Sequence, residues 1–229
     1  MVEANKLKQK KYRQANQQFI IEGFHLVEEA YKAGLLEMVF SLEKPAFKDV
    51  ETYIVNEEII KKLSDVQSPQ GIIGVCKMKE KEAVQGKIVL LDRLQDPGNM
   101  GTLIRSAVAF GFNTMVIDQC VDIYNPKVIR ATQGALFKMN IIEENILSFM
   151  DNHKHIEFLA TDLSSVIHLE DLEVRSDNLG IILGNEGNGV RKEIIDASDL
   201  IFKLKMQNME SLNAGVAGSI IMYYLGGAQ

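Results

Sequence analysis

The sequence is poor in cysteine, histidine and proline, and it contains no tryptophan. Its 229 residues include 2 cysteines, 4 histidines and 4 prolines. Cys76 and Cys120 are too few and too far apart for a disulfide-rich scaffold, so we expect free thiols in a reducing cytoplasm. The histidines are scattered, and the nearest pair, His153 and His155, lies in the polar stretch DNHKHIE. We expect that pair in a surface loop, and we expect no metal site.

Long apolar runs are also absent. No window approaches 18 consecutive apolar residues, so no membrane span is expected. The first residues, MVEANKLKQKKYRQ, lack the apolar core of a secretory signal. With 46% hydrophobic and 24% charged residues, the composition is that of an ordinary globular protein. These features predict a cytoplasmic protein with no membrane partner.

The charge excludes a protein that coats nucleic acid nonspecifically, because the formal net charge is -6. One basic cluster stands against this background at the N-terminus: Lys6, Lys8, Lys10, Lys11 and Arg13. A basic arm of this kind can contact RNA phosphates. The alternative is a solvated, frayed terminus.

The hydrophobic pattern predicts two α/β domains. Residues 1–80 alternate short strands with helices, and the charged segment that ends in Gly86 predicts a linker over 81–86. From residue 87 to 229, short buried strands such as KIVLLD alternate with helices. Such alternation indicates a parallel sheet covered on both faces.

A glycine-rich stretch, IILGNEGNGV at 181–190, follows one of these strands. A dinucleotide fingerprint would be spaced GxGxxG in the first strand-to-helix turn, whereas this motif is spaced GxxGxG and comes late. A phosphate-binding P-loop is excluded because no Gly-Lys-Ser/Thr triplet is present. The motif therefore predicts either a ligand-binding loop that carries Glu186 or only a tight turn.

Two further segments contain polar residues at strand and helix ends. In LQDPGNMGTLIRSAVAFGF (94–112), Asn99 can cap a helix, and Arg105 sits on a largely apolar helix. An arginine there either reaches the surface or binds an anion. In the last segment, Ser211 and Asn213 precede a run of small residues. That run would let the helix approach another helix, a second subunit or a ligand.

Together, the three segments resemble the motifs of the SpoU (TrmH-type) family of RNA ribose 2'-O-methyltransferases, within the SPOUT class. The matching elements are Asn99 and Arg105 followed by AFG, then GNEGNG, then SLNAGVA, in the family's order and spacing. ATQGALF (131–137) is also similar. FIIEGFHLVEEA and SPQGIIGV resemble a ribosomal-protein-like RNA-binding domain that many members have. KLK at 203–205 and NAGVA at 213–217 depart from the common family pattern.

The resemblance implies an α/β protein with a small RNA-binding domain over 1–80 and a SPOUT domain over 87–229. The SPOUT domain would contain a parallel sheet and a deep trefoil knot, would bind S-adenosyl-L-methionine and would form a homodimer. The reaction would methylate a ribose 2'-hydroxyl in ribosomal RNA. Transfer RNA as the substrate, a base as the acceptor, and a non-catalytic RNA-binding or ribosome-assembly role remain alternatives.

The resemblance also implies roles for individual residues. Arg105 would clamp the phosphate beside the reacting ribose, or would act as the general base. The expected catalytic residues are Asn99, Arg105, Glu186, Ser211 and Asn213. The expected cofactor-binding residues are Leu183, Gly184, Gly189, Lys203 and Leu212.

Overall fold

The structure is a computed structural model that describes residues 2–174, 176 and 178–226. The chain divides into two compact units. The N-terminal unit is Met1–Glu80 with Asp122–Lys138, and the C-terminal unit is Lys81–Val121 with Met139–Gln229. The sequence analysis had assigned 122–138 to the second domain, but in the structure this segment packs with the first.

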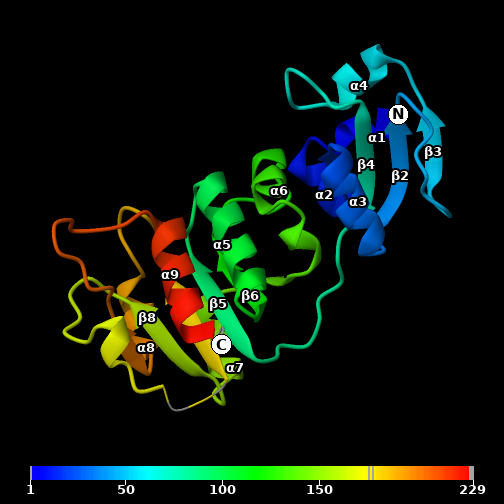
Figure 1. Ribbon diagram of the computed structural model, residues 1–229. Coiled ribbons are helices and arrows are strands. Elements are labelled where there is room, and N and C mark those ends of the chain that lie inside the picture. The colour runs from blue at the N-terminus through cyan, green and yellow to red at the C-terminus, as the bar shows by residue number, and fades with distance from the viewer. Residues whose placement is uncertain (1, 175, 177, 227–229) are drawn as a thin grey trace. The chain divides into compact units, whose positions relative to one another are not determined.

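The N-terminal unit is a four-stranded sheet with helices, and its residues up to 80 are drawn in blue to cyan in Figure 1. The sheet order is β1-β4-β2-β3, with β4 antiparallel to β1 and β2 and with β2 parallel to β3. The strands are β1 (Gln18–Glu22), β2 (Leu36–Ser41), β3 (Glu51–Ile54) and β4 (Ile72–Lys77). The helices of residues 1–80 are α1 (Val2–Lys6), α2 (Lys10–Asn16), α3 (Phe24–Lys32) and α4 (Glu57–Leu63).

Residues 122–138 join this unit through aromatic and ionic contacts with β1 and α2. The segment forms α6 (Pro126–Thr132) and a short 3-10 helix (Ala135–Phe137). The ring of Phe19 lies 4.7 Å from that of Tyr124 and 6.4 Å from that of Phe137, measured between centroids. Arg13 forms an ion pair with Asp122. Phe19 is therefore a core residue, whereas Phe24 is 58% exposed.

The C-terminal unit is built on a six-stranded sheet of order β10-β8-β9-β5-β6-β7, in which every pairing is parallel. This confirms the predicted parallel sheet. The strands are β5 (Lys87–Asp92), β6 (Phe112–Asp118), β7 (Asn140–Glu143), β8 (Glu157–Thr161), β9 (Leu179–Leu183) and β10 (Leu200–Phe202). The central strand β9 is buried along its whole length, as expected for a sheet covered on both faces.

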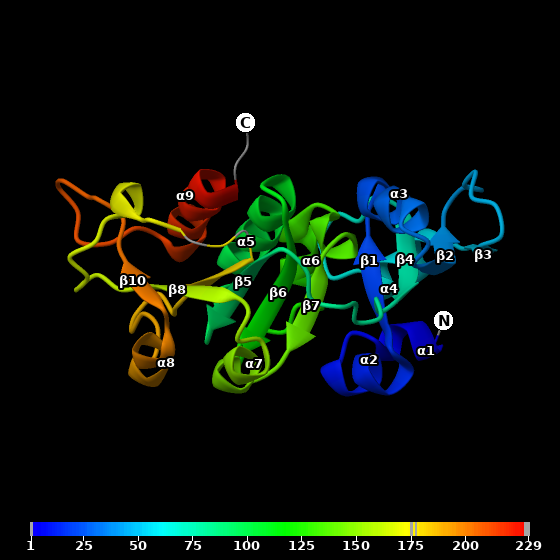
Figure 2. The same cartoon turned by 90° about the horizontal axis from the view of Figure 1, so that it is seen from below.

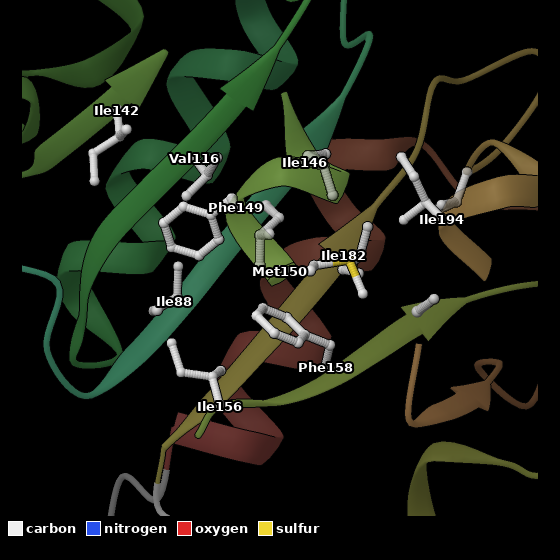
Figure 3. Close-up of a cluster of buried hydrophobic side chains, with 13 residues drawn as sticks. Ile88, Val116, Ile142, Ile146, Phe149, Met150, Ile156, Phe158, Ile182 and Ile194 are labelled. Carbon is white, nitrogen blue, oxygen red and sulfur yellow. The ribbon is translucent and has the colours of Figure 1, made fainter. Parts of the chain in front are cut away.

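Helices cover both faces of this sheet (Figure 2). One side bears α5 (Pro97–Ala109) and α9 (Ala214–Gly226), and the other bears α7 (Ile146–Asn152) and α8 (Lys192–Ala197). A short 3-10 helix at Leu169–Asp171 lies in the connection after β8. Figure 3 shows the core on the α7 and α8 side, where Phe149 and Phe158 pack among isoleucines of several strands.

The segment after Glu80 belongs structurally to the C-terminal unit. The side chain of Asn140 donates to the carbonyl of Glu82 at 3.0 Å and accepts from its amide at 3.0 Å. Asn140 is only 3% exposed, so this pairing satisfies a buried amide. Glu82, in the expected linker, belongs to no strand. The Asn140 side chain makes the two backbone hydrogen bonds that a neighbouring strand would otherwise make.

Helices α5 and α9 run side by side and in the same direction. The hydroxyl groups of Ser106 and Ser219 lie 2.7 Å apart, and Phe110 contacts Tyr223 edge to face. A Cβ on Gly218 would lie 2.4 Å from Leu103 Cδ2, so glycine is what allows this approach. Of the alternatives left open by the sequence, Gly218 serves contact with a neighbouring helix, whereas Ala214 and Ala217 line a cavity.

Candidate functional site

A cavity of about 510 Å³ lies at the carboxyl ends of β8 and β9 in the C-terminal unit. Ligands of open α/β sheets bind at this edge. The cavity is lined by the end of β8, the loop after β9, the chain that leads into α9, and side chains of α8 and α9. The lining residues that the sequence analysis had named are Leu183, Gly184, Glu186, Gly189, Lys203, Ser211 and Leu212.

The loop after β9, residues 184–190, is closed at its neck by backbone pairing. The amide of Asn185 donates to the carbonyl of Gly189 at 3.1 Å, and the reverse bond is 2.9 Å. A Cβ on Gly184 would lie 2.0 Å from the carbonyl carbon of Gly189, which itself has φ +65°. Position 184 therefore requires glycine, and the positive φ of position 189 favours it. We call residues 184–190 the glycine loop.

Three backbone amides of the glycine loop are paired within the loop itself. The amides of Asn185 and Gly189 bond within the loop, and that of Gly187 donates to the side chain of Asn185 at 2.9 Å. The glycines thus shape a tight loop whose wall faces the cavity.

Glu186, near the tip of the glycine loop, meets Asn99 of α5. Asn99 Nδ2 donates to Glu186 Oε1 at 2.7 Å. Asn99 is 7% exposed, and the capping role considered for it belongs to Asp96, which accepts from the Asn99 amide at 2.7 Å. The Asn99 side chain is therefore not used as the cap of α5, and its role in catalysis stays a prediction.

Arg105 stands apart from these residues. It is exposed on α5 and does not line the cavity. Within the described chain, no hydrogen bond or ion pair holds its guanidinium group. The structure brings Asn99 and Glu186 together but does not bring Arg105 to either of them.

The segment before α9 places Ser211 and Leu212 in the cavity wall and gives Asn213 a capping role. Asn213 Oδ1 accepts from the amide of Val216 at 3.1 Å, and its carbonyl accepts from Ala217 at 2.9 Å. A Cβ on Gly215 would lie 3.1 Å from Asn99 Oδ1 and 3.2 Å from Asn213 Oδ1. The two asparagines therefore meet where α9 begins.

Lys203, the first residue of the departing KLK segment, is fixed through its backbone. Its amide donates to the carbonyl of Ile167 at 3.0 Å, and its carbonyl accepts from Leu169 at 2.9 Å. Its Nζ lies 3.5 Å from the carbonyl oxygen of Leu163. Among the described residues that line the cavity, Lys203 is the one lysine or arginine.

The five basic residues at the N-terminus are ordered on α1, α2 and the turn between them. Lys6 pairs with Glu3 at 2.7 Å, and Lys8 donates to the carbonyls of Lys62 and Ser64. Only Lys10 and Lys11 of the five are exposed.

Arg13 has a different role from the RNA contact that the sequence suggested. It is 5% exposed and donates to the carbonyls of Leu7 and Lys8 at 2.9 and 2.8 Å. Together with the Asp122 pair, these bonds make Arg13 a structural residue of the N-terminal unit.

The sequence analysis missed a buried ionic cluster beside the site. Asp92 and Asp118 end the neighbouring strands β5 and β6, and they are 0% and 5% exposed. Arg191, which follows the glycine loop, contacts both carboxylates at 2.8 and 2.5 Å. Burial lowers the pKa of Arg191, but the hydrogen bond to Asp118 and the charges of both carboxylates outweigh it and raise that pKa. Two strands that both end in aspartate were the available signal.

Other chemistries find little support in the described residues. Among them, no group of three or more histidine, cysteine or acidic side chains could hold a metal ion. Within the same residues, no helix has the length and apolar character needed to cross a membrane. Cys76 and Cys120 are free, and burial raises the pKa of the Cys120 thiol to about 11.

Known structures share this fold over nearly the whole chain. A TrmH-family protein from Porphyromonas gingivalis superposes with a TM-score of 0.88 at 25% identity, covering 98% of this chain and 95% of that one. An AdoMet-bound rRNA methyltransferase from Sinorhizobium meliloti shows the same fold, with a TM-score of 0.85 at 24% identity over 98% of this chain and 92% of that one. Fold and cavity thus place the chain in the SPOUT class of α/β proteins.

Sequence comparisons identify the family. The model of the SpoU rRNA Methylase family matches residues 86–223, and that of the MRM3-like substrate binding domain matches residues 2–74. The 23S rRNA (guanosine(2553)-2'-O)-methyltransferase RlmP of Bacillus subtilis (strain 168) is 35% identical over 97% of this chain and 94% of its own length. This chain belongs to the SpoU rRNA methylase family.

Proposed function

We propose that this chain is an RNA methyltransferase that transfers a methyl group from S-adenosyl-L-methionine to a ribose 2'-hydroxyl of ribosomal RNA. The observation that carries the proposal is the cavity closed by the glycine loop, with the Asn99–Glu186 pair at its edge. End-to-end similarity to a 23S rRNA 2'-O-methyltransferase supports the substrate class and the acceptor.

The cavity fits this cofactor in size and chemistry. Its volume of about 510 Å³ lies within the usual range for small-ligand sites. Leu183, Leu204 and Ile221 offer apolar contacts for an adenine ring. Asp162, Glu186 and Glu210 outnumber the single cation Lys203, which suits a ligand that carries a sulfonium charge. When bound, the cofactor supplies a methyl group on sulfur and leaves as a neutral thioether, so the reaction needs no metal.

The protein residues would orient the ribose and stabilise the charge that develops on its oxygen. A carbon–oxygen bond would form as the carbon–sulfur bond breaks, and the hydroxyl proton would leave to solvent water. Asn99 and Ser211 would hold the ribose in line with the methyl group, with Glu186 fixing the Asn99 amide. The guanidinium group of Arg105 offers only hydrogen-bond donors, so it suits a phosphate and alkoxide clamp better than a base.

The position of Arg105 favours a site shared between two copies of the chain. Arg105 does not line the cavity of its own chain, and α9 leaves a row of apolar side chains exposed. These side chains are 43% to 60% exposed: Val216, Ile220, Tyr223 and Tyr224. We therefore propose a homodimer through the C-terminal unit, in which Arg105 of one subunit serves the cavity of the other.

The segments that share the cavity support the trefoil knot as part of the same proposal. The glycine loop and the segment 203–217 line one cavity, and structures with this fold are SpoU and TrmH proteins. The N-terminal unit would bind the RNA, in line with its match to a substrate-binding domain. A ribosomal RNA substrate and two free thiols favour a cytoplasmic location.

Two measurements test this function. Calorimetry of the purified protein should show binding of S-adenosyl-L-methionine, and mapping of 2'-O-methyl groups in total RNA should reveal a ribosomal position that depends on this protein. A position in transfer RNA would replace the substrate, and a methylated base in a product digest would replace the acceptor. Absence of cofactor binding would favour a non-catalytic RNA-binding protein.

A further inference from the structure

Both ends of the glycine loop are fastened to the end of β5. At the start of the loop, Asn185 Nδ2 donates to the carbonyl of Arg93 at 2.9 Å. Just after the loop, Arg191 grips Asp92 twice, because its backbone amide reaches Oδ2 and its Nε reaches Oδ1, each at 2.8 Å. The two partners, Asp92 at the end of β5 and Arg93 just after it, are adjacent residues. Both ends of the glycine loop are therefore held at one place at the edge of the sheet.

Asp118 extends this attachment to the next strand. Its Oδ2 accepts from Arg191 Nη2 at 2.5 Å and from the Asn145 side chain and the Ile146 amide at 3.1 Å each. Arg191 therefore bridges the ends of β5 and β6, and Asp118 also holds the start of α7. Arg93 does not compete for this role, since its Nε lies 3.4 Å from Asp92 and makes no hydrogen bond.

The attachment closes a ring that includes the proposed site. From Asp92 the chain runs through Arg93 to Asn99 on α5, and Asn99 bonds to Glu186 in the glycine loop. From Glu186 the loop returns to Arg191, which binds Asp92. The place where Arg191 holds the loop thus determines the distance between Glu186 and Asn99. It also determines the position of the cavity wall that the loop forms.

Stability alone is a weak reason for such a cluster. Buried ion pairs lose the hydration of both partners, and apolar side chains of similar volume often hold a core as well. An arginine fork, in contrast, fixes direction, because its planar donors bind two carboxylates in one geometry. A loop that forms the cavity wall beside a reacting ribose requires such a fixed orientation.

We infer that Arg191, held by Asp92 and Asp118, is a positioning residue that sets the glycine loop for cofactor binding and for the Asn99–Glu186 pair. The inference rests on the proposed methyl transfer and assigns a role to residues outside the three family-like motifs. Arg191 acts through the loop and does not line the cavity.

The test compares Arg191→Lys with Lys192→Met, its exposed neighbour. Lysine keeps the charge but cannot bind Asp92 and Asp118 through one planar fork. We expect the Kd for S-adenosyl-L-methionine to rise, and kcat to fall, each on the order of tenfold, because a misplaced wall disturbs alignment. Lys192→Met should match the wild type in both.

Two readouts separate positioning from a general loss of structure. Without cofactor, hydrogen exchange of the Asn185 and Gly189 amides should accelerate in Arg191→Lys, while exchange in the strands stays as in the wild type. In an Asn99→Ala background, Arg191→Lys should lower kcat much less than it does alone, since both changes act through one pair.

The outcomes divide cleanly. Unchanged Kd, kcat and loop exchange in a folded Arg191→Lys protein would overturn the inference, as would a fully additive double variant. If Arg191→Lys fails to fold, Asp118→Asn replaces it, because asparagine keeps an acceptor oxygen and similar volume, and the same shifts are expected. A wild-type protein that neither binds the cofactor nor methylates RNA would instead overturn the proposed function.

Discussion

At the scale of single residues, Asn99 and Glu186 of the proposed site are already held in place, whereas Arg105 is not. Asn99 and Glu186 bind each other at 2.7 Å within the chain. Arg105 is exposed on the same helix as Asn99 and has no polar partner within the described residues. A guanidinium group without a partner suits a residue that binds RNA phosphate on arrival.

Arg105→Ala should therefore abolish methyl transfer and leave the Kd of S-adenosyl-L-methionine within a few fold of the wild type. The reason is that Arg105 lies outside the cavity wall, so its loss removes charge stabilisation but no cofactor contact. Calorimetry gives the Kd, and transfer of labelled methyl to RNA gives the rate. Equal loss of cofactor binding and of methyl transfer would contradict this division of roles. Lys154→Ala serves as the control for loss of a positive charge, because the Lys154 side chain is 80% exposed.

At the scale of secondary-structure elements, the wall of the cavity depends on how closely α9 approaches α5 and β9. A Cβ on Gly218 would lie 2.4 Å from Leu103 and 2.6 Å from Leu183. Leu183 is itself a cavity residue. Helix packing and cofactor site are therefore linked through one glycine.

Gly218→Val should destabilise the protein by about 1–3 kcal/mol through overpacking, and it should weaken cofactor binding because Leu183 must shift. Urea unfolding measures the first effect and calorimetry the second. Gly215→Ala is the milder comparison, since its nearest atoms lie at 3.1 to 3.3 Å and are side-chain atoms. Equal stability of both variants and the wild type would show that α9 can move away from α5 without cost.

The elements also show what the sequence could and could not predict. Strands, helices and the glycine loop follow from local patterns, whereas the pairing of Asn99 with Glu186 joins residues 87 positions apart in the chain. The cluster of Asp92, Asp118 and Arg191 depends on the register of β5 with β6, which local patterns do not contain. The placement of 122–138 depends on distant contacts with Phe19 and Arg13. Asp96 caps α5 because Asp96 precedes Pro97, and proline is favoured in the first turn of a helix.

At the scale of the whole molecule, the N-terminal basic cluster must be tested without removing the segment that carries it. Ala4 and Leu7 belong to the core of the N-terminal unit, and Arg13 is buried. Deleting these residues would unfold the surface under test. Lys10 and Lys11 are exposed, so they are the pair to change.

The double variant Lys10→Ala/Lys11→Ala should weaken RNA binding and flatten its salt dependence. Each lost phosphate contact reduces the slope of log K against log salt by about 0.7–0.9, so two contacts predict about 1.4–1.8. Affinity measured over a salt series gives the slope. An unchanged slope would mean that this pair does not contact phosphates, and Lys61→Ala, on α4 and paired with Glu57, controls for the loss of a lysine on the same unit.

A shared site predicts complementation between two defective subunits. Ala217 lines the cavity, so Ala217→Phe should fill it and block the cofactor, while Arg105→Ala leaves the cavity open. In a mixed dimer, the open cavity of one subunit would face the intact Arg105 of the other, and one of the two sites would work. Doubly tagged mixed dimers should thus recover about half of the wild-type rate, whereas each parent dimer stays inactive. Inactive mixed dimers beside an active wild type would mean that Arg105 and the cavity of the same chain form each site, because in that case every site of the mixed dimer carries one defect.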